Sequence, residues 1–326
     1  MSNVAYSNAR AKSLENYLLG EERINRMIDS DKPDDALKIL SEVNFGEGTT
    51  ISSALDFEKL ISAEKKKLFD FIKETCASPA LADFIMLKSD FHNAEAIIKS
   101  KYLKIEIDDI LDVSGKFDID KMKEKIFEDD YSSFPDELTK ALSFSDVEFV
   151  EGRASGVKIA SFFSKAYFSE LYRLAKKDSI LLELYRVKAD VANVGIALRL
   201  RDFSQAKEHF VEIGKITLQE LQALSEEQLE LLVEKFKFSY ISELISSAIY
   251  SVKNGESLSD FEKGADSFAV NLMLKQKYAT DGIFPFMQYC FYKLADLSNV
   301  RIIMVGLING LNKSDIKNRL RAYYER

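Results

Sequence analysis

The sequence predicts an all-α protein made of three similar helical domains. Helix-breaking residues are rare, because only 4 prolines and 13 glycines are spread over 326 residues. Apolar side chains recur at steps of three and four residues in several segments, which is the spacing of a helix with one buried face. One polar motif also recurs at domain-sized intervals. Together these features favour helices over strands and a repeated unit over one large domain.

Three segments carry the clearest helical spacing. Near the N-terminus, apolar side chains stand at Leu14, Leu18, Ile24 and Ile28. Between residues 180 and 198 they stand at Leu181, Leu184, Val187, Val191, Val194 and Leu198. The third segment covers residues 218–232, with a break expected at Ser225. Each is expected to form helix with one buried face.

Local signals mark the start of two further helices. Ser78 followed by Pro79 is typical of a helix start, with serine as the cap and proline in the first turn. Ser225 and the three residues after it have the pattern of a capping box, which predicts a helix beginning there. Residues 104–107 and 147–151 alternate briefly in polarity and are the candidates for strands.

The polar motif is an aspartate followed three residues later by an asparagine, and apolar residues continue after it. It occurs in residues 87–99, 187–199 and 293–305, where the pairs are Asp90/Asn93, Asp190/Asn193 and Asp296/Asn299. A second marker repeats in the first two copies, since Gly115-Lys116 is echoed by Gly214-Lys215. We therefore expect three domains of about 100 residues, a common domain size, covering residues 1–114, 115–213 and 214–326.

We interpret these six polar residues as structural. On a helix, positions three apart share a face, and Asp190 lies beside the apolar stripe. A buried carboxylate needs donors, because leaving it unpaired is costly. The alternative is a metal or catalytic carboxylate. A contact that determines the fold must recur in every copy of a domain, whereas an active site rarely does.

Other chemistry is sparse in the sequence. The net charge of −8 opposes a nucleic-acid partner. The two histidines, His92 and His209, fall in different predicted domains, and Cys76 and Cys290 form no disulfide or zinc motif. The sequence holds no phosphate loop, nucleophile elbow or zinc-protease motif. No catalytic, metal-binding or cofactor-binding residue is therefore predicted.

The most apolar run, residues 302–311, is too short to span a membrane and is bounded by Arg301 and Lys313. We interpret it as a buried helix. Gly306 and Gly310 inside it have the spacing that lets two helices pack closely. We therefore expect no direct membrane span.

An acidic motif offers an alternative function. Asp108, Asp109 and Asp112 have the DDxxD spacing with which helical prenyl-diphosphate synthases hold magnesium. Such enzymes normally carry a second acidic motif and nearby arginines, and this sequence has neither. A solvated acidic stretch is the favoured interpretation, and the magnesium-dependent synthase is the alternative.

The repeat-bearing segments resemble one known family. Residues 185–193, the block Asp296–Leu311, the ending Asp315–Tyr324 and the opening Ala5–Leu19 are similar to the C subunit of V/A-type ATPases, which is called the d subunit in eukaryotes. The matches run in order along nearly the whole chain, and the C-terminal block is the most specific.

The resemblance implies three similar helical domains arranged as a funnel around a pseudo-threefold axis. It implies a non-catalytic adaptor of the central stalk, monomeric within its complex and peripheral on the cytoplasmic face of the membrane. Its partners would be the D- and F-type shaft subunits and the membrane rotor ring. It would couple shaft to ring during ATP-driven proton or sodium transport, or ATP synthesis. The resemblance implies no cofactor and no nucleic-acid partner.

Overall fold

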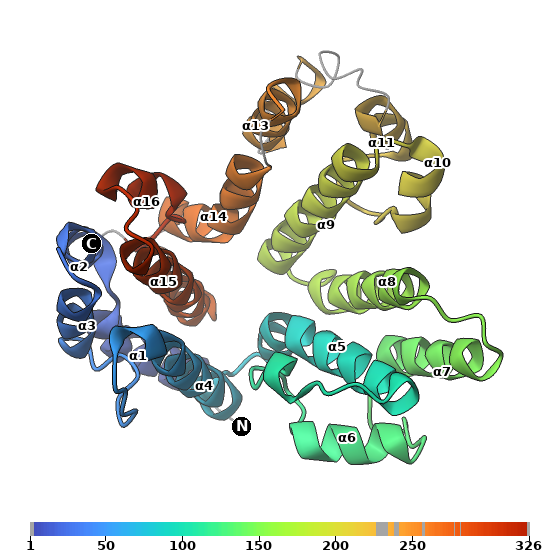
Figure 1. Cartoon of the computed structure of the whole chain (residues 1–326), viewed down its shortest axis with the longest axis horizontal. Helices are drawn as coiled ribbons and strands as arrows, with labels where there is room; N and C mark the ends of the chain where they lie inside the picture. Colours follow the sequence, from blue (N-terminus) through green and yellow to red (C-terminus); the bar gives the residue numbers. More distant parts are fainter. Residues whose placement is uncertain are drawn as a thin grey trace. The chain divides into compact units, whose positions relative to one another are not determined.

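The structure of the chain, a computed structural model, describes residues 3–225, 234–237, 241–255, 258–276, 278–280 and 282–324. All regular elements in this part of the chain are helices (Figure 1). The all-α prediction is therefore confirmed. The strand candidates are wrong, because residues 147–150 lie in α7 (Asp136–Val150) and residues 104–107 form a loop.

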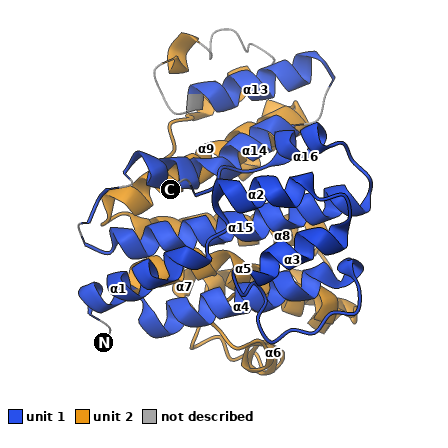
Figure 2. Ribbon diagram, turned by 90° about the vertical axis from the view of Figure 1, so that its left-hand side faces the viewer, with its two compact units in different colours: residues 1–78, 238–326 blue, residues 79–237 orange. Residues whose placement is uncertain are grey.

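The chain forms two compact units, coloured separately in Figure 2. Unit 1 contains residues 1–78 and 238–326, and unit 2 contains residues 79–237. The division into three domains at residues 114 and 213 stays a prediction.

Unit 1 is built around one long helix, α15 (Phe284–Ile308). The N-terminal part supplies α1 (Val4–Leu14), α2 (Gly20–Asp29), α3 (Pro33–Ser41) and α4 (Phe57–Thr75), with short 3-10 turns at Glu15–Tyr17 and Ala54–Asp56. The C-terminal part supplies α13 (Ile241–Lys253), α14 (Ser259–Lys275) and α16 (Lys313–Arg319). Helices α1, α2, α3, α4, α14 and α16 all pack against α15. A helix covered on so many sides is apolar around most of its circumference, as its sequence requires.

Unit 2 consists of helices that pack against one another. It begins with α5 (Pro79–Leu103), then a 3-10 turn (Asp108–Ile110), α6 (Ile119–Phe127) and α7 (Asp136–Val150). It continues with α8 (Gly156–Ala175), α9 (Ser179–Leu200), α10 (Phe203–Ala206), a 3-10 turn (Lys207–His209) and α11 (Leu218–Ser225). Helix α5 packs on α6, α7 and α8, while α9 packs on α8, α10 and α11.

Local chemistry explains several helix starts. Helix α5 begins at Pro79, as predicted, because proline suits the first turn of a helix. Helix α9 is capped by Asp178, whose carboxylate accepts from the backbone N–H groups of Ile180 and Leu181 at 2.9 and 3.0 Å. Ser225 is the last residue of α11, and residues 226–228 of the predicted capping box lie outside the described residues.

The three Asp–Asn pairs lie in the three helices α5, α9 and α15, which have 25, 22 and 25 residues and are the longest described. Among the described helices, none combines the length and the apolar character that crossing a bilayer would require.

Candidate functional site

Each of the three asparagines holds both backbone polar groups of one later residue. The carboxamide nitrogen donates to the backbone carbonyl oxygen, and the carboxamide oxygen accepts from the backbone N–H. The pairs are Asn93 with Asp112 (2.8 and 2.8 Å), Asn193 with Val211 (2.8 and 2.9 Å) and Asn299 with Arg321 (3.1 and 2.8 Å). All three asparagines are buried. The carboxamide thus replaces a backbone partner for the segment that follows each long helix.

The aspartates of the first two copies hold the same segment a few residues further on. Oδ1 of Asp90 accepts from the backbone N–H of Phe117 at 3.1 Å. Oδ1 of Asp190 accepts from the backbone N–H of Ile216 at 2.8 Å. Both carboxylates are buried. We call each Asp–Asn pair with its backbone partners a latch.

A glycine stands two residues before each of these donors, at the marker that repeats in the sequence. A Cβ on Gly115 would lie 2.3 Å from Oδ1 of Asp90, and a Cβ on Gly214 would lie 2.2 Å from Oδ1 of Asp190. Both distances are shorter than any real contact of this kind. The backbone can therefore approach the carboxylate only where the residue has no side chain.

The third latch takes its donor from the opposite end of the chain. Oδ2 of Asp296 accepts from the backbone N–H of Leu19 at 3.0 Å. Tyr17 stands two residues before Leu19, where the other latches have glycine. Oδ1 of Asp296 has no hydrogen-bond partner in the described part of the chain. Burial raises the pKa of Asp296 to about 6, although the nearby Lys293 ammonium acts in the opposite direction.

The structure thus gives the three asparagines one kind of contact, while Asp296 differs from the other two aspartates in its donor. The assignment of the six residues as structural stays a prediction. The sequence marked the two glycines as a repeat without revealing their purpose. It carried no signal for the contact of Leu19 with Asp296.

The acidic motif does not form a metal site. Asp108 lies in the 3-10 turn with Asp109 and pairs with Lys123 at 2.7 Å. The backbone of Asp112 is hydrogen-bonded to the side chain of Asn93, so Asp112 belongs to the first latch. No cluster of acidic, histidine or cysteine side chains suited to a metal occurs among the described residues. The synthase alternative is not supported.

The histidines and cysteines also lie apart from any such cluster. His92 has a ring nitrogen 2.8 Å from a backbone carbonyl oxygen, and His209 has one 2.9 Å from a serine hydroxyl. Cys76 and Cys290 are not in a disulfide. Burial raises the pKa of the Cys290 thiol well above its ordinary value, which makes it unreactive.

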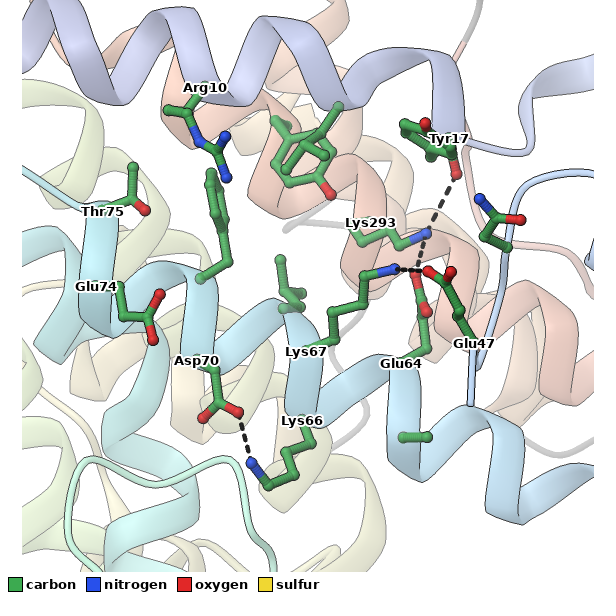
Figure 3. A pocket seen from close by; sticks show the side chains of 16 residues that line it. Arg10, Tyr17, Glu47, Glu64, Lys66, Lys67, Asp70, Glu74, Thr75 and Lys293 are labelled. Atoms are coloured by element: carbon green, nitrogen blue, oxygen red, sulfur yellow. Dashed lines mark hydrogen bonds and ion pairs between the residues drawn. The ribbon is translucent and has the colours of Figure 1, made fainter. Parts of the chain in front are cut away.

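Unit 1 also contains a pocket of about 760 Å³ between α1 and α4, with α15 as its third wall (Figure 3). Lys293 of α15 and Glu64 of α4 form an ion pair of 2.7 Å inside it, and both side chains are buried. Glu64 also accepts from the backbone N–H of Gly46 at 2.9 Å, and Lys293 donates to the carbonyl oxygen of Tyr17 at 3.3 Å. A buried pair is sustained only with such added hydrogen bonds. Sequence reasoning missed this pocket, although a lysine inside the apolar helix was a signal.

Comparison with known families matches residues 7–319 to the family described as ATP synthase (C/AC39) subunit. The chain is 21% identical to the C subunit of the V-type sodium ATPase of Enterococcus hirae, with 97% of both chains covered. It is 18% identical to the C subunit of the A-type ATP synthase of Methanocaldococcus jannaschii, with 97% of this chain and 86% of that protein covered. The chain therefore belongs to the ATP synthase (C/AC39) subunit family, as a non-catalytic C subunit of a V/A-type rotary ATPase.

Proposed function

We propose that the chain is the central-stalk adaptor of its rotary ATPase and couples the rotating shaft to the membrane rotor ring. The adaptor serves ATP-driven proton or sodium transport, or ATP synthesis. The observation that carries this proposal is the family match over residues 7–319. One relative belongs to a V-type sodium ATPase and the other to an A-type ATP synthase. These two relatives are consistent with a role in either ATP-driven transport or ATP synthesis.

The build of the chain supports a part that transmits torque. Such a part must resist bending, so its loops need to be fixed to its helices. The latches do this at three places, where asparagine side chains hold the backbone of the following segment. The recurrence of one contact also supports our proposal of three similar domains, residues 1–114, 115–213 and 214–326, in a funnel with a pseudo-threefold axis.

The proposed partners follow from that role. The adaptor binds the D- and F-type shaft subunits on one side and the rotor ring on the other, through broad surfaces. It is peripheral, on the cytoplasmic face of the membrane, and present as a monomer within the complex.

A reconstitution experiment tests the coupling. ATPase complexes would be purified with and without the chain, placed in vesicles, and assayed for ATP hydrolysis and for ATP-driven ion uptake. We expect complexes without the chain to lose ion uptake while the catalytic head still hydrolyses ATP. Adding the purified chain back should restore uptake.

Two controls sharpen the result. A chain carrying Gly156→Ala should restore uptake fully, because a Cβ at Gly156 meets no atom within 4 Å. Binding of the chain to the isolated rotor ring in detergent should be measurable directly. Normal assembly and ion uptake without the chain would refute the proposal.

A further inference from the structure

The pocket of unit 1 holds polar groups that the fold does not use. The two lysines at its rim have acidic partners, since Lys66 pairs with Asp70 at 2.5 Å and Lys67 lies 3.7 Å from Glu47. Arg10 differs. Its guanidinium makes no hydrogen bond or ion pair with any described residue, and Figure 3 shows it reaching from α1 into the pocket. An unmatched guanidinium in a pocket offers a fork of donors suited to a phosphate or carboxylate.

Two further donors lie on α15, one helical turn apart. Tyr289 lines the pocket and is only 5% exposed, yet its hydroxyl has no hydrogen-bond partner among the described residues. The ammonium of Lys293 has three hydrogens, and its polar contacts are with Glu64 and with the carbonyl oxygen of Tyr17. The same ammonium also lies over the ring of Phe45, 5.3 Å from the ring centroid, so it gives the pocket a fixed positive charge. Arg10 and the Tyr289 hydroxyl thus bring donors without a protein partner to one pocket, where an acceptor on a ligand could bind them.

The pocket also contains one unmatched carboxylate. Glu74 on α4 makes no hydrogen bond or ion pair with the described residues. Apolar surface between the charged groups comes from Leu14 and from Phe71, whose ring packs edge-on against Tyr289 at 5.6 Å between centroids. The unused groups are thus donors for an anion, one acceptor for a cation, and an apolar surface.

We propose that this pocket binds a zwitterionic phosphate ester that carries an ammonium group. Arg10 and the hydroxyl of Tyr289 hold the phosphate, and the Lys293 ammonium, which is fixed by its own contacts, adds positive charge beside it. Glu74 pairs with the ammonium. The tetrahedral phosphate offers more acceptor atoms than a carboxylate, which suits donors that converge from two helices. The volume of about 760 Å³ lies in the range of small-molecule sites.

This chemistry occurs both in a phospholipid headgroup and in a free phosphoamine, and the test separates the two. The full chain would be titrated by calorimetry with O-phosphoethanolamine, inorganic phosphate and glycerol 3-phosphate. In parallel, sedimentation would measure binding to vesicles of phosphatidylethanolamine mixed with phosphatidylcholine, against vesicles of phosphatidylcholine with phosphatidylglycerol.

We expect O-phosphoethanolamine to bind more tightly than inorganic phosphate. Arg10→Gln and Tyr289→Phe should each weaken binding about tenfold, the effect of losing one hydrogen bond to a charged group. Glu74→Gln should weaken O-phosphoethanolamine and leave inorganic phosphate unchanged. Lys66→Gln is the matched control at the same rim and should change neither.

Binding of the soluble ester with no preference among vesicles assigns a free phosphoamine as the ligand. Preferential binding to the phosphatidylethanolamine vesicles, lost in Arg10→Gln, assigns the lipid headgroup. Circular dichroism of each variant verifies that it is folded. The proposal is overturned if no probe binds the folded chain at millimolar concentration, if phosphate alone binds as tightly as the ester, or if the three variants bind like the unmodified chain.

Discussion

At the level of single residues, each latch gives a buried polar side chain in an apolar helix partners on the backbone of a later segment. The segment after each long helix carries backbone N–H and C=O groups that no helix satisfies. A buried orphan group costs about 1–3 kcal/mol, so each needs a partner. One carboxamide supplies a donor and an acceptor at once, which no apolar residue and no carboxylate can do.

Replacing Asn193 tests this role. Asn193→Ala leaves the N–H and C=O of Val211 without partners in a buried site, so we expect the free energy of unfolding to fall by about 1–3 kcal/mol. Urea denaturation followed by circular dichroism measures the change. Asn309→Ala is the control, because the Asn309 side chain bonds the carbonyl oxygen of Val305 in an exposed position. Equal stability of the two variants would contradict the structural role.

The latch glycines allow a steric test. Gly115→Ala and Gly214→Ala place a Cβ at 2.3 and 2.2 Å from a buried carboxylate oxygen, so the backbone must move and the aspartate loses its donor. We expect each to destabilise the chain by about 2–4 kcal/mol, a range typical of overpacking combined with a lost buried hydrogen bond. Gly156→Ala, at the start of α8, meets no atom within 4 Å and should be neutral or slightly stabilising. A melting temperature that did not fall in either latch variant would argue against the contact.

The third latch predicts a dependence of stability on pH. Burial raises the pKa of Asp296 from 3.8 to about 6, so the folded chain binds this proton more tightly than the unfolded chain. Stability from this group is then complete below pH 4 and is lost as the pH rises through about 6. The loss amounts to about 3 kcal/mol. Lys293 opposes the shift and Glu64 adds to it.

Asp296→Asn removes the titration and should remove this part of the pH dependence. Urea unfolding of both chains at pH 4.5 and pH 7.5 would measure it. The unmodified chain should lose more stability between these two values than Asp296→Asn does. A parallel response of the two chains would mean that Asp296 is charged throughout.

At the level of elements, the end of α15 shows two glycines with different purposes. Gly310 has a φ of +66° and follows the helix, and a Cβ there would meet nothing within 4 Å. Its N–H bonds the carbonyl oxygen of Leu307 at 3.2 Å, and the N–H of Leu311 bonds that of Gly306 at 2.9 Å. This pair of bonds is the Schellman ending of a helix. Only Gly306 is therefore a packing glycine, and the expectation that both permit close packing is half correct.

The packing of α16 on α15 depends on Gly306. A Cβ at this position would lie 2.5 Å from Cγ1 of Ile316, which is buried. We expect Gly306→Ala to destabilise unit 1 by about 1–3 kcal/mol, because α16 must shift. The double variant with Ile316→Ala should cost less than the sum of the single changes, since the smaller side chain removes the clash. Additive effects in this double-mutant cycle would contradict the contact.

At the level of the whole molecule, the two ends of the chain build one unit. Helices α1 and α4 from the N-terminal part pack on α15 from the C-terminal part. Ser7 of α1 donates its hydroxyl to the carbonyl oxygen of Thr75 at 2.6 Å, and Leu19 donates to Asp296. Unit 1 thus cannot complete its core until the last part of the chain is present.

Deleting residues 1–17 should therefore unfold unit 1 selectively. The truncated chain loses α1, which packs on α15, and loses the support of the segment that carries the Leu19 donor. Hydrogen exchange followed by mass spectrometry should find the amides of α15 unprotected and those of α8, in unit 2, still protected. Retained protection of α15 would show that α1 is dispensable for unit 1.

Much of the fold could be predicted from the sequence. The all-α class, the start of α5 at Pro79 and the repeated Asp–Asn motif depend on interactions within a few residues, such as helical periodicity and capping. The family also follows from these residues, because the motif lies in segments that characterise it. The strand predicted from the alternating run at residues 147–151 was wrong. Residues 147–150 lie in a helix, because packing in the folded chain overrides their local preference.

The helices, the recurring Asp–Asn motif and the family could be recognised from the sequence. Which groups meet depends on the tertiary structure. It paired Asn93 with the backbone of Asp112, and it brought Leu19 to Asp296 across 277 residues of chain. It also gathered Arg10, Glu74 and Tyr289 around one pocket. Such contacts depend on the path of the whole chain, because burial and hydrogen bonding act between neighbours in space that can be far apart in the sequence.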